Sequence, residues 1–152
     1  MGLDWAMPYL RVTCPPLPAE RKRHIAGQLT EAVNLLFFSP RGGPTREELR
    51  ERTTIHFTEY GGDDLYIGGR SSGERGVTDL TVELSDWNMG VCQQRRVARH
   101  LTPLLARLFG VKDPDNVNLR FHSYPPTAFA AGGRLLADRV PRIGQAMKKL
   151  QG

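Results

Sequence analysis

The feature that most constrains the fold is an internal repeat. A first set of matches is separated by 72 residues, and a second set, after residue 50, by 64. The eight residues that make the difference fall in a loop of the first copy, residues 39–50. The matches are Leu29-Thr30 with Leu101-Thr102, Phe37 with Phe109, Phe57 with Phe121, Tyr60 with Tyr124, and Gly68-Gly69-Arg70 with Gly132-Gly133-Arg134. A constant spacing over matches of this kind indicates a duplicated unit.

Each copy has the hydrophobic pattern of a strand, a helix and a second strand. In the first copy, the expected strands are residues 8–13 and 53–59, and an apolar stripe with helical spacing predicts a helix over 19–38. In the second copy, the alternating segments 79–84 and 117–123 flank a helix predicted over 91–109. Each copy is therefore expected to form a βαβ unit.

Two such units predict an α+β fold. Each unit should pair its strands in parallel through a right-handed crossover, which gives one four-stranded sheet with both helices on one face. Neither copy covers its strands alone, so we expect a single domain over residues 1–152. The repeats within it run from about 8 to 70 and from 78 to 134, and a C-terminal tail follows over 135–152.

Composition excludes several classes of function. The chain has 152 residues and a net charge of +5, and 17 of its 21 basic residues are arginine, a residue suited to binding carboxylates or nucleic acid. The arginines are scattered among acids without a nucleic-acid-binding motif, so no nucleic-acid partner is expected. No apolar run reaches about 18 residues, the start lacks a basic leader pattern, and two cysteines form no disulfide framework or metal site. We expect a cytoplasmic protein without a membrane segment or a metal.

Three short motifs carry a resemblance to a known family. They are Met7-Pro8-Tyr9-Leu10-Arg11-Val12, Thr58-Glu59 and Tyr66-Ile67-Gly68-Gly69. The sequence resembles the tautomerase superfamily of 4-oxalocrotonate tautomerase, well over residues 8–69 and as a degenerate second copy over 79–134. In layout it is similar to fused two-copy members such as the cis-3-chloroacrylic acid dehalogenases and malonate semialdehyde decarboxylases.

The resemblance implies a cofactor-independent enzyme. In the family, a proline exposed by removal of the initiator methionine acts through its secondary amine, and Pro8 matches that position. An α-amino group titrates near pH 8, and burial with nearby cations lowers its pKa, so the free base exists at neutral pH. The implied activity is a tautomerase or isomerase acting on a small keto/enol or unsaturated carboxylic acid. The alternatives are a hydratase or decarboxylase of the same superfamily, or a non-catalytic binding or assembly protein of this fold.

The sequence departs from the family where the substrate carboxylate should bind. The matching position of the founding member's catalytic arginine is Thr54, so Arg11 and Arg120 are the replacement candidates. His56 is the first-copy counterpart of Arg120, and Phe129 is the pocket aromatic before Gly-Gly. These four residues are predicted to bind substrate, against the simpler possibility that they are packing, surface or interface residues.

Six residues precede Met7, and they decide whether Pro8 can be a base. If translation starts at Met1, the Pro8 nitrogen is an amide without a basic lone pair. If it starts at Met7, removal of that methionine frees the amine, and we favour this case. The resemblance further implies a homotrimer in which residues 134–150 wrap a neighbouring chain, since the sheet leaves one face bare and its edge strands unpaired. A heteromeric partner that completes the site stays open.

Overall fold

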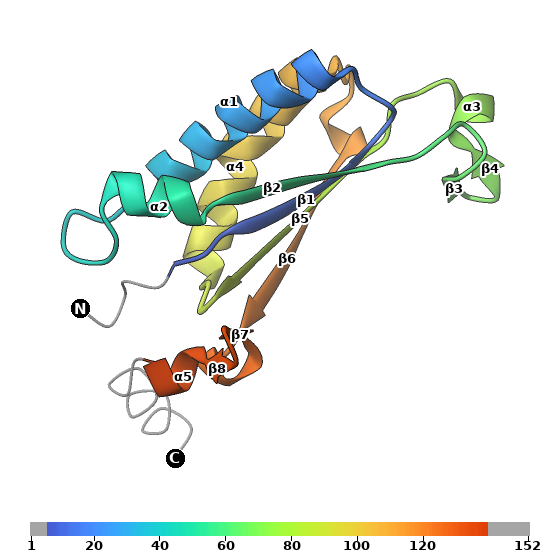
Figure 1. The fold of residues 1–152 in the computed structure, drawn as a ribbon. Helices are drawn as coiled ribbons and strands as arrows, with labels where there is room; N and C mark the ends of the chain where they lie inside the picture. Colours follow the sequence, from blue (N-terminus) through green and yellow to red (C-terminus); the bar gives the residue numbers. More distant parts are fainter. Residues whose placement is uncertain (1–5, 140–152) are drawn as a thin grey trace.

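The computed structural model describes residues 6–139. The sequence-based predictions for residues 140–152, which include most of the wrapping tail, lie outside the described residues. The first copy contains β1 (Tyr9–Cys14), α1 (Ala19–Phe37), α2 (Arg46–Arg52), β2 (Thr54–Glu59), β3 (Tyr66–Ile67), β4 (Arg70–Ser71) and α3 (Ser72–Arg75) (Figure 1). The second contains β5 (Leu80–Trp87), α4 (Val91–Phe109), η1 (Pro114–Asn116), β6 (Val117–Tyr124), η2 (Pro126–Ala128), β7 (Ala130–Ala131), β8 (Arg134–Leu135) and α5 (Leu136–Arg139).

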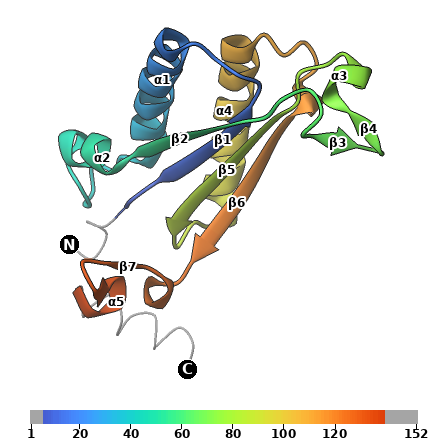
Figure 2. The same ribbon diagram turned by 45° about the vertical axis from the view of Figure 1, so that its right-hand side comes forward.

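The predicted α+β architecture is confirmed. One four-stranded sheet has the order β2-β1-β5-β6, with each outer strand parallel to its inner neighbour and the inner pair antiparallel (Figure 2). The helices α1 and α4 each join a parallel pair, and they cover the same face of the sheet. They have the same length and start 72 residues apart, as the repeat predicts.

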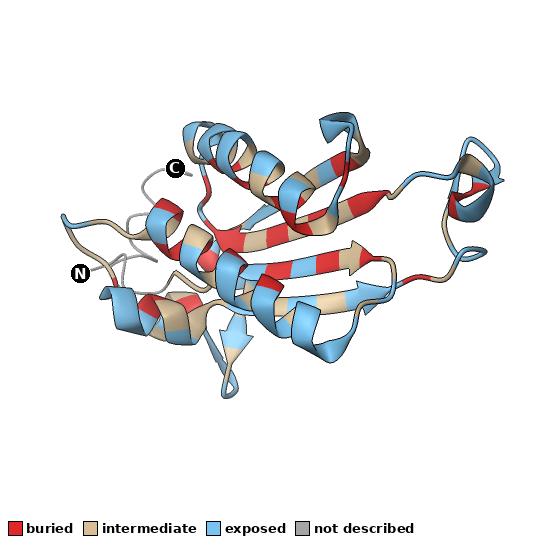
Figure 3. Ribbon diagram, turned by 90° about the horizontal axis from the view of Figure 1, so that it is seen from above, coloured by how far each residue is buried: buried red, intermediate tan, exposed pale blue. Residues whose placement is uncertain are grey.

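The core lies between the sheet and the two long helices. Along β5 buried residues alternate with partly exposed ones, and this alternation puts Leu80, Val82 and Leu84 against the helices (Figure 3). Leu29 of α1 and Leu101 of α4 are both fully buried in the same cluster. The two copies therefore share one hydrophobic core.

The antiparallel helices are tied together at both ends by arginines. Arg21, near the start of α1, donates from Nη2 to the backbone oxygen of Leu108 at 2.5 Å. Arg96, near the start of α4, donates to the backbone oxygen of Leu36, the residue that corresponds to Leu108 in the repeat. Each arginine thus satisfies a carbonyl that the last turn of the other helix leaves without an intrahelical partner.

The glycine pairs of the repeat form two matching hairpin turns. Gly68 and Gly69 have φ angles of 61° and 75°, and Gly132 and Gly133 have φ angles of 60° and 80°. A two-residue hairpin turn with positive φ at both positions favours glycine, which explains why both copies keep the pair. The turns join β3 to β4 and β7 to β8, and a one-turn helix follows each of them.

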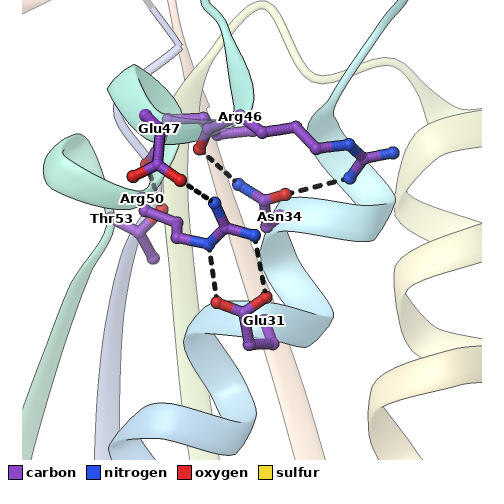
Figure 4. A network of polar contacts seen from close by, with 7 residues as sticks. Glu31, Asn34, Arg46, Glu47, Arg50 and Thr53 are labelled. Atoms are coloured by element: carbon purple, nitrogen blue, oxygen red, sulfur yellow. Dashed lines mark hydrogen bonds and ion pairs between the residues drawn. The ribbon is translucent and has the colours of Figure 1, made fainter.

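A polar network joins α1 to α2 (Figure 4). Buried Asn34 donates to the backbone oxygen of Arg46 at 2.8 Å and accepts from its guanidinium at 3.0 Å. Arg50 bridges Glu31, at 2.7 Å, and Glu47, at 2.6 Å. The network fixes both ends of the loop over residues 38–45, which belongs to the segment where the first copy is eight residues longer.

The face of the sheet opposite the helices carries polar residues in register. His56, Arg11, Glu83 and Arg120 pair side by side across β2, β1, β5 and β6, and we call them the charged row. Within residues 6–139 there is no helix both long and apolar enough to cross a membrane.

Candidate active site

A hollow of about 180 Å³ lies where β1 begins and β5 ends. Its wall is formed by Ala6 before β1, by the end of β5 and by the loop after α1, and these meet because β1 and β5 are antiparallel. The wall mixes apolar and uncharged polar groups with one carboxyl group, that of Asp86; it includes Ala6, Phe37, Ser39, Pro44, Trp87 and Gln93. The hollow is large enough for a small organic acid.

Pro8 is buried directly before β1, two residues after Ala6 of the hollow's wall, and it does not line the hollow itself. Its backbone oxygen accepts from the Thr54 N–H at 2.9 Å, which fixes the residue before β1 against the start of β2. The preceding residue, Met7, donates its N–H to Oδ1 of Asp86 at 3.1 Å. In this chain the Pro8 nitrogen is in the peptide bond with Met7, so it carries no basic lone pair while that bond is intact.

Asp86 is the functional candidate that the sequence interpretation missed. It is only 2% exposed, and its Oδ1 accepts a second hydrogen bond from the Trp87 N–H at 2.8 Å. Burial raises the pKa of this carboxyl group to about 6, although the two backbone hydrogen bonds act in the opposite direction. A group with such a pKa can hold or release a proton near neutrality, as general acid–base catalysis requires.

A signal for Asp86 was present in the sequence. The predicted strand ended at residue 84, but β5 continues to Trp87, and Asp86 occupies the next helix-facing position after Leu80, Val82 and Leu84. An acidic residue that occupies the next position of an apolar alternation indicates a carboxyl group that is buried if the strand continues that far. The extension exists because β6 stays paired with β5 as far as Trp87 and Tyr124.

The turn between β5 and α4 forms another part of the wall. Asn88 has a φ angle of 54°, a left-handed conformation that is uncommon for a residue other than glycine. Its N–H bonds to the Tyr124 oxygen at 3.1 Å, and the Met89 N–H bonds to Oγ of Ser123 at 2.9 Å. Among residues 6–139, no side chain caps the start of α4 at Gly90, and the backbone N–H groups there favour nearby negative charge.

Three of the predicted substrate-binding residues lie together, but not at the hollow. Arg11, His56 and Arg120 belong to the charged row, and their side alternates with the helix-facing side that Asp86 shares. The Arg11 guanidinium donates to Glu83 at 2.6 Å, and Nδ1 of His56 lies 2.7 Å from the Tyr9 hydroxyl. Within one chain these residues therefore face away from Pro8. Their role in substrate binding stays a prediction.

The fourth predicted residue, Phe129, packs at the same end of the sheet as the hollow. Its ring stacks on Tyr124 with centroids 5.9 Å apart, and the two pack against Trp87 and Leu136. Burial, and then the charge of Asp86, raise the pKa of Tyr124 to about 12. Trp87 belongs both to this cluster and to the wall of the hollow, so Phe129 packs on the side of Trp87's cluster and does not line the hollow itself.

Within residues 6–139, no three histidine, cysteine or acidic side chains gather as a set of metal ligands.

Comparison with known proteins identifies the fold. No protein-family model and no curated protein matches the sequence. A fused 4-OT wild-type asymmetric trimer is similar with a TM-score of 0.70 at 20% identity, covering 86% of this chain and 98% of that one. A member of the cis-3-chloroacrylic acid dehalogenase family has a TM-score of 0.64 at 17% identity, covering 84% and 82%. Pt0534, solved after inactivation by 2-oxo-3-pentynoate, has a TM-score of 0.69 at 16% identity, covering 86% and 98%. The chain has the fold of these solved structures in a fused, two-copy layout, as the sequence predicted.

Proposed function

We propose that this protein is a cofactor-independent tautomerase that acts on a small keto/enol or unsaturated carboxylic acid. The observation that carries the proposal is the placement of Pro8: it is buried directly before β1, and the residue before it, Met7, bonds to Asp86, a carboxyl group of raised pKa in the wall of the hollow. In a form that begins at Pro8, the free secondary amine would take the hydroxyl proton of an enol. Protonation of the neighbouring carbon then completes the isomerisation.

The test compares two forms of the protein. The full chain, with mass spectrometry to confirm the intact Met7–Pro8 bond, and a form that begins at Pro8 are each assayed for ketonisation of phenylenolpyruvate. We expect activity in the form that begins at Pro8, loss of that activity in Pro8→Ala, and covalent labelling of its amine by 2-oxo-3-pentynoate. If neither form acts on this enol or on related 2-oxo acids, the alternative of a non-catalytic binding protein is favoured.

We further propose a homotrimer in which the charged row faces a second copy. The row carries both signs of charge, and a fused 4-OT of similar fold is described as a trimer. The substrate carboxylate would then be bound by Arg11 or Arg120 of an adjacent copy. Light scattering should give three times the chain mass, and a monomer at micromolar concentration would contradict the assembly. The cytoplasm, where thiols such as exposed Cys92 stay reduced, is the proposed location.

Arg120 offers a test of the carboxylate site. If its guanidinium binds the substrate's carboxylate, Arg120→Ala should lower kcat/KM, with a loss of transition-state stabilisation of about 2–4 kcal/mol. Arg99→Ala, at an exposed position of α4, serves as the matched control for lost positive charge. Equal activity of both variants would leave Arg120 as an interface residue.

A further inference from the structure

We propose that Asp86 is the group that transfers the proton in the hollow, and that it does so while Pro8 remains bonded to Met7. This inference rests on the proposed function for its reaction class, but it assigns the chemistry to a side chain that is present in the full chain. It also gives a role to residue 7, whose N–H holds the carboxylate in place.

The first argument is that the two oxygens of the Asp86 carboxylate differ in their hydrogen bonds. Oδ1 accepts both backbone hydrogen bonds, from Met7 and from Trp87. Among residues 6–139, no group donates to Oδ2, and this oxygen is not one of the fully enclosed atoms that lack a partner, which fits its place at the wall of the hollow. Two bonds to one oxygen fix the plane of the carboxylate, and they leave the other oxygen for a molecule in the hollow.

The second argument comes from the other buried aspartate. Asp79 is also almost fully buried, at 3% exposed, but its carboxylate forms an ion pair with Arg75. Asp79 is therefore a structural charge with a counter-ion. No cation pairs with Asp86 among the described residues, so its ionised form is costly to bury, and such unpaired buried acids are candidates for functional groups. The contrast separates the functional acid from the structural acid.

The third argument is that the hollow can complete the reaction. The Asp86 carboxylate takes the enol hydroxyl proton, the electron pair moves to form the carbonyl, and the C=C pair takes the proton back from the carboxyl group at carbon. The substrate loses an O–H bond and gains a C–H bond, and Asp86 ends as it began. Asn88 and Gln93 line the same hollow and can donate to the charged oxygen as it develops.

The experiment uses the full chain with the Met7–Pro8 bond intact, assayed with phenylenolpyruvate. Asp86→Asn keeps the shape and can still accept both N–H groups, so folding is checked by circular dichroism. We expect this variant to lose at least about 100-fold in kcat/KM, a typical contribution of general acid–base catalysis. The wild type should gain kcat/KM as the pH rises through about 6, because the carboxylate form is the base. Asp79→Asn is the matched control and should keep both the activity and this pH profile.

The outcomes separate this inference from the proposed function. A folded Asp86→Asn variant whose kcat/KM lies within about threefold of wild type overturns the role of Asp86 and leaves the tautomerase proposal standing. Activity confined to the form that begins at Pro8, and unaffected by Asp86→Asn, does the same and assigns the amine as base. Inactivity of both wild-type forms overturns both proposals.

Discussion

The two ends of the sheet have equivalent backbone paths, but a thiol stands at one end where a carboxyl group stands at the other. Cys14 ends β1 and Asp86 lies near the end of β5, 72 residues later in the repeat, and both are buried on the helix-facing side. Beside Cys14, the Leu17 N–H donates to Glu59 at 2.7 Å. Beside Asp86, the Met89 N–H donates to the corresponding residue, Ser123, at 2.9 Å. The duplication has therefore preserved how the chain leaves the strand.

What differs is the side chain at the shared position and its surroundings. At the first end, burial and the charge of Glu59 raise the pKa of the Cys14 thiol to about 11, so the group is neutral and packs as a small apolar residue. At the second end, an acid lines a hollow, because the chain before β1 and the loop after α1 leave space beside it. One end of a duplicated fold can thus keep the packing while the other gains a site.

The largest expected effect tests whether the copies depend on one another. Leu29→Ala in α1 and Leu101→Ala in α4 remove equivalent, fully buried side chains from one core. Each should lower the free energy of unfolding by about 2–5 kcal/mol, the usual cost of a Leu→Ala cavity. Urea unfolding at a fixed protein concentration, followed by fluorescence and by circular dichroism, should show one transition for each variant. Two separate transitions would mean that the copies unfold independently.

The second prediction concerns the pH dependence that Asp86 adds to stability. Its folded pKa, about 6, lies above the ordinary value of 3.8, so the folded state binds more protons than the unfolded state between these values. The stabilisation is complete below about pH 4 and is lost as the pH rises through 6, in total about 3 kcal/mol. Unfolding free energies of Asp86→Asn and wild type should therefore diverge over this range, in favour of the variant.

Cys14→Ala is the control for this pH experiment. The Cys14 thiol keeps its proton well beyond neutral pH, because its pKa is raised to about 11. The difference in unfolding free energy between this variant and wild type should stay constant between pH 4 and 8. A difference for Asp86→Asn that is equally constant would show that Asp86 does not titrate in this range.

The sequence predicted the fold well because the fold depends on patterns that repeat. Helix α4 spans the predicted residues, and α1 and the four sheet strands lie close to theirs, since apolar periodicity directly reports which face is buried. The Gly68-Gly69 and Gly132-Gly133 matches correspond to hairpin turns that need positive φ. The main difference is β5, which continues past Leu84 because pairing with β6, a tertiary contact, outweighs the polar residues at its end.

The site was harder to predict because it depends on which polar residues are buried, and the hydrophobic pattern does not show this. The arginines were selected for their chemistry, but strand alternation puts Arg11 and Arg120 on the face away from Pro8. The expected strand ended at residue 84, so Asp86 fell outside it and its burial on β5 was not predicted. The hollow beside it is lined by segments distant in sequence, namely the chain before β1 and the loop after α1, and a periodic pattern does not report such a contact.

The third prediction concerns a substitution that removes a contact found only in the first copy. Asn34, which corresponds to Ala106 in the second copy, is 1% exposed and bonded to Arg46 in both directions. Asn34→Ala removes the side-chain donor to the Arg46 carbonyl and the acceptor of the Arg46 guanidinium, and should cost about 1–3 kcal/mol of unfolding free energy. Glu31→Gln, which weakens the exposed pair with Arg50 in the same network, is the control and should cost less. A larger loss for Glu31→Gln would mean that the exposed ion pair, and not the buried amide, holds α2.

The smallest expected effect concerns the reactivity of the thiol at the first end of the sheet. Cys14 is fully buried, and with a pKa of about 11 only about one thiol in a thousand is ionised at pH 8. Cys92, at the start of α4, is exposed. A thiol reagent such as DTNB should therefore label one cysteine per native chain at once and the second only after unfolding, and Cys92→Ser should abolish the fast phase. Fast labelling that persists in Cys92→Ser would show that the first end opens to solvent, and that the two ends differ less in packing than the structure indicates.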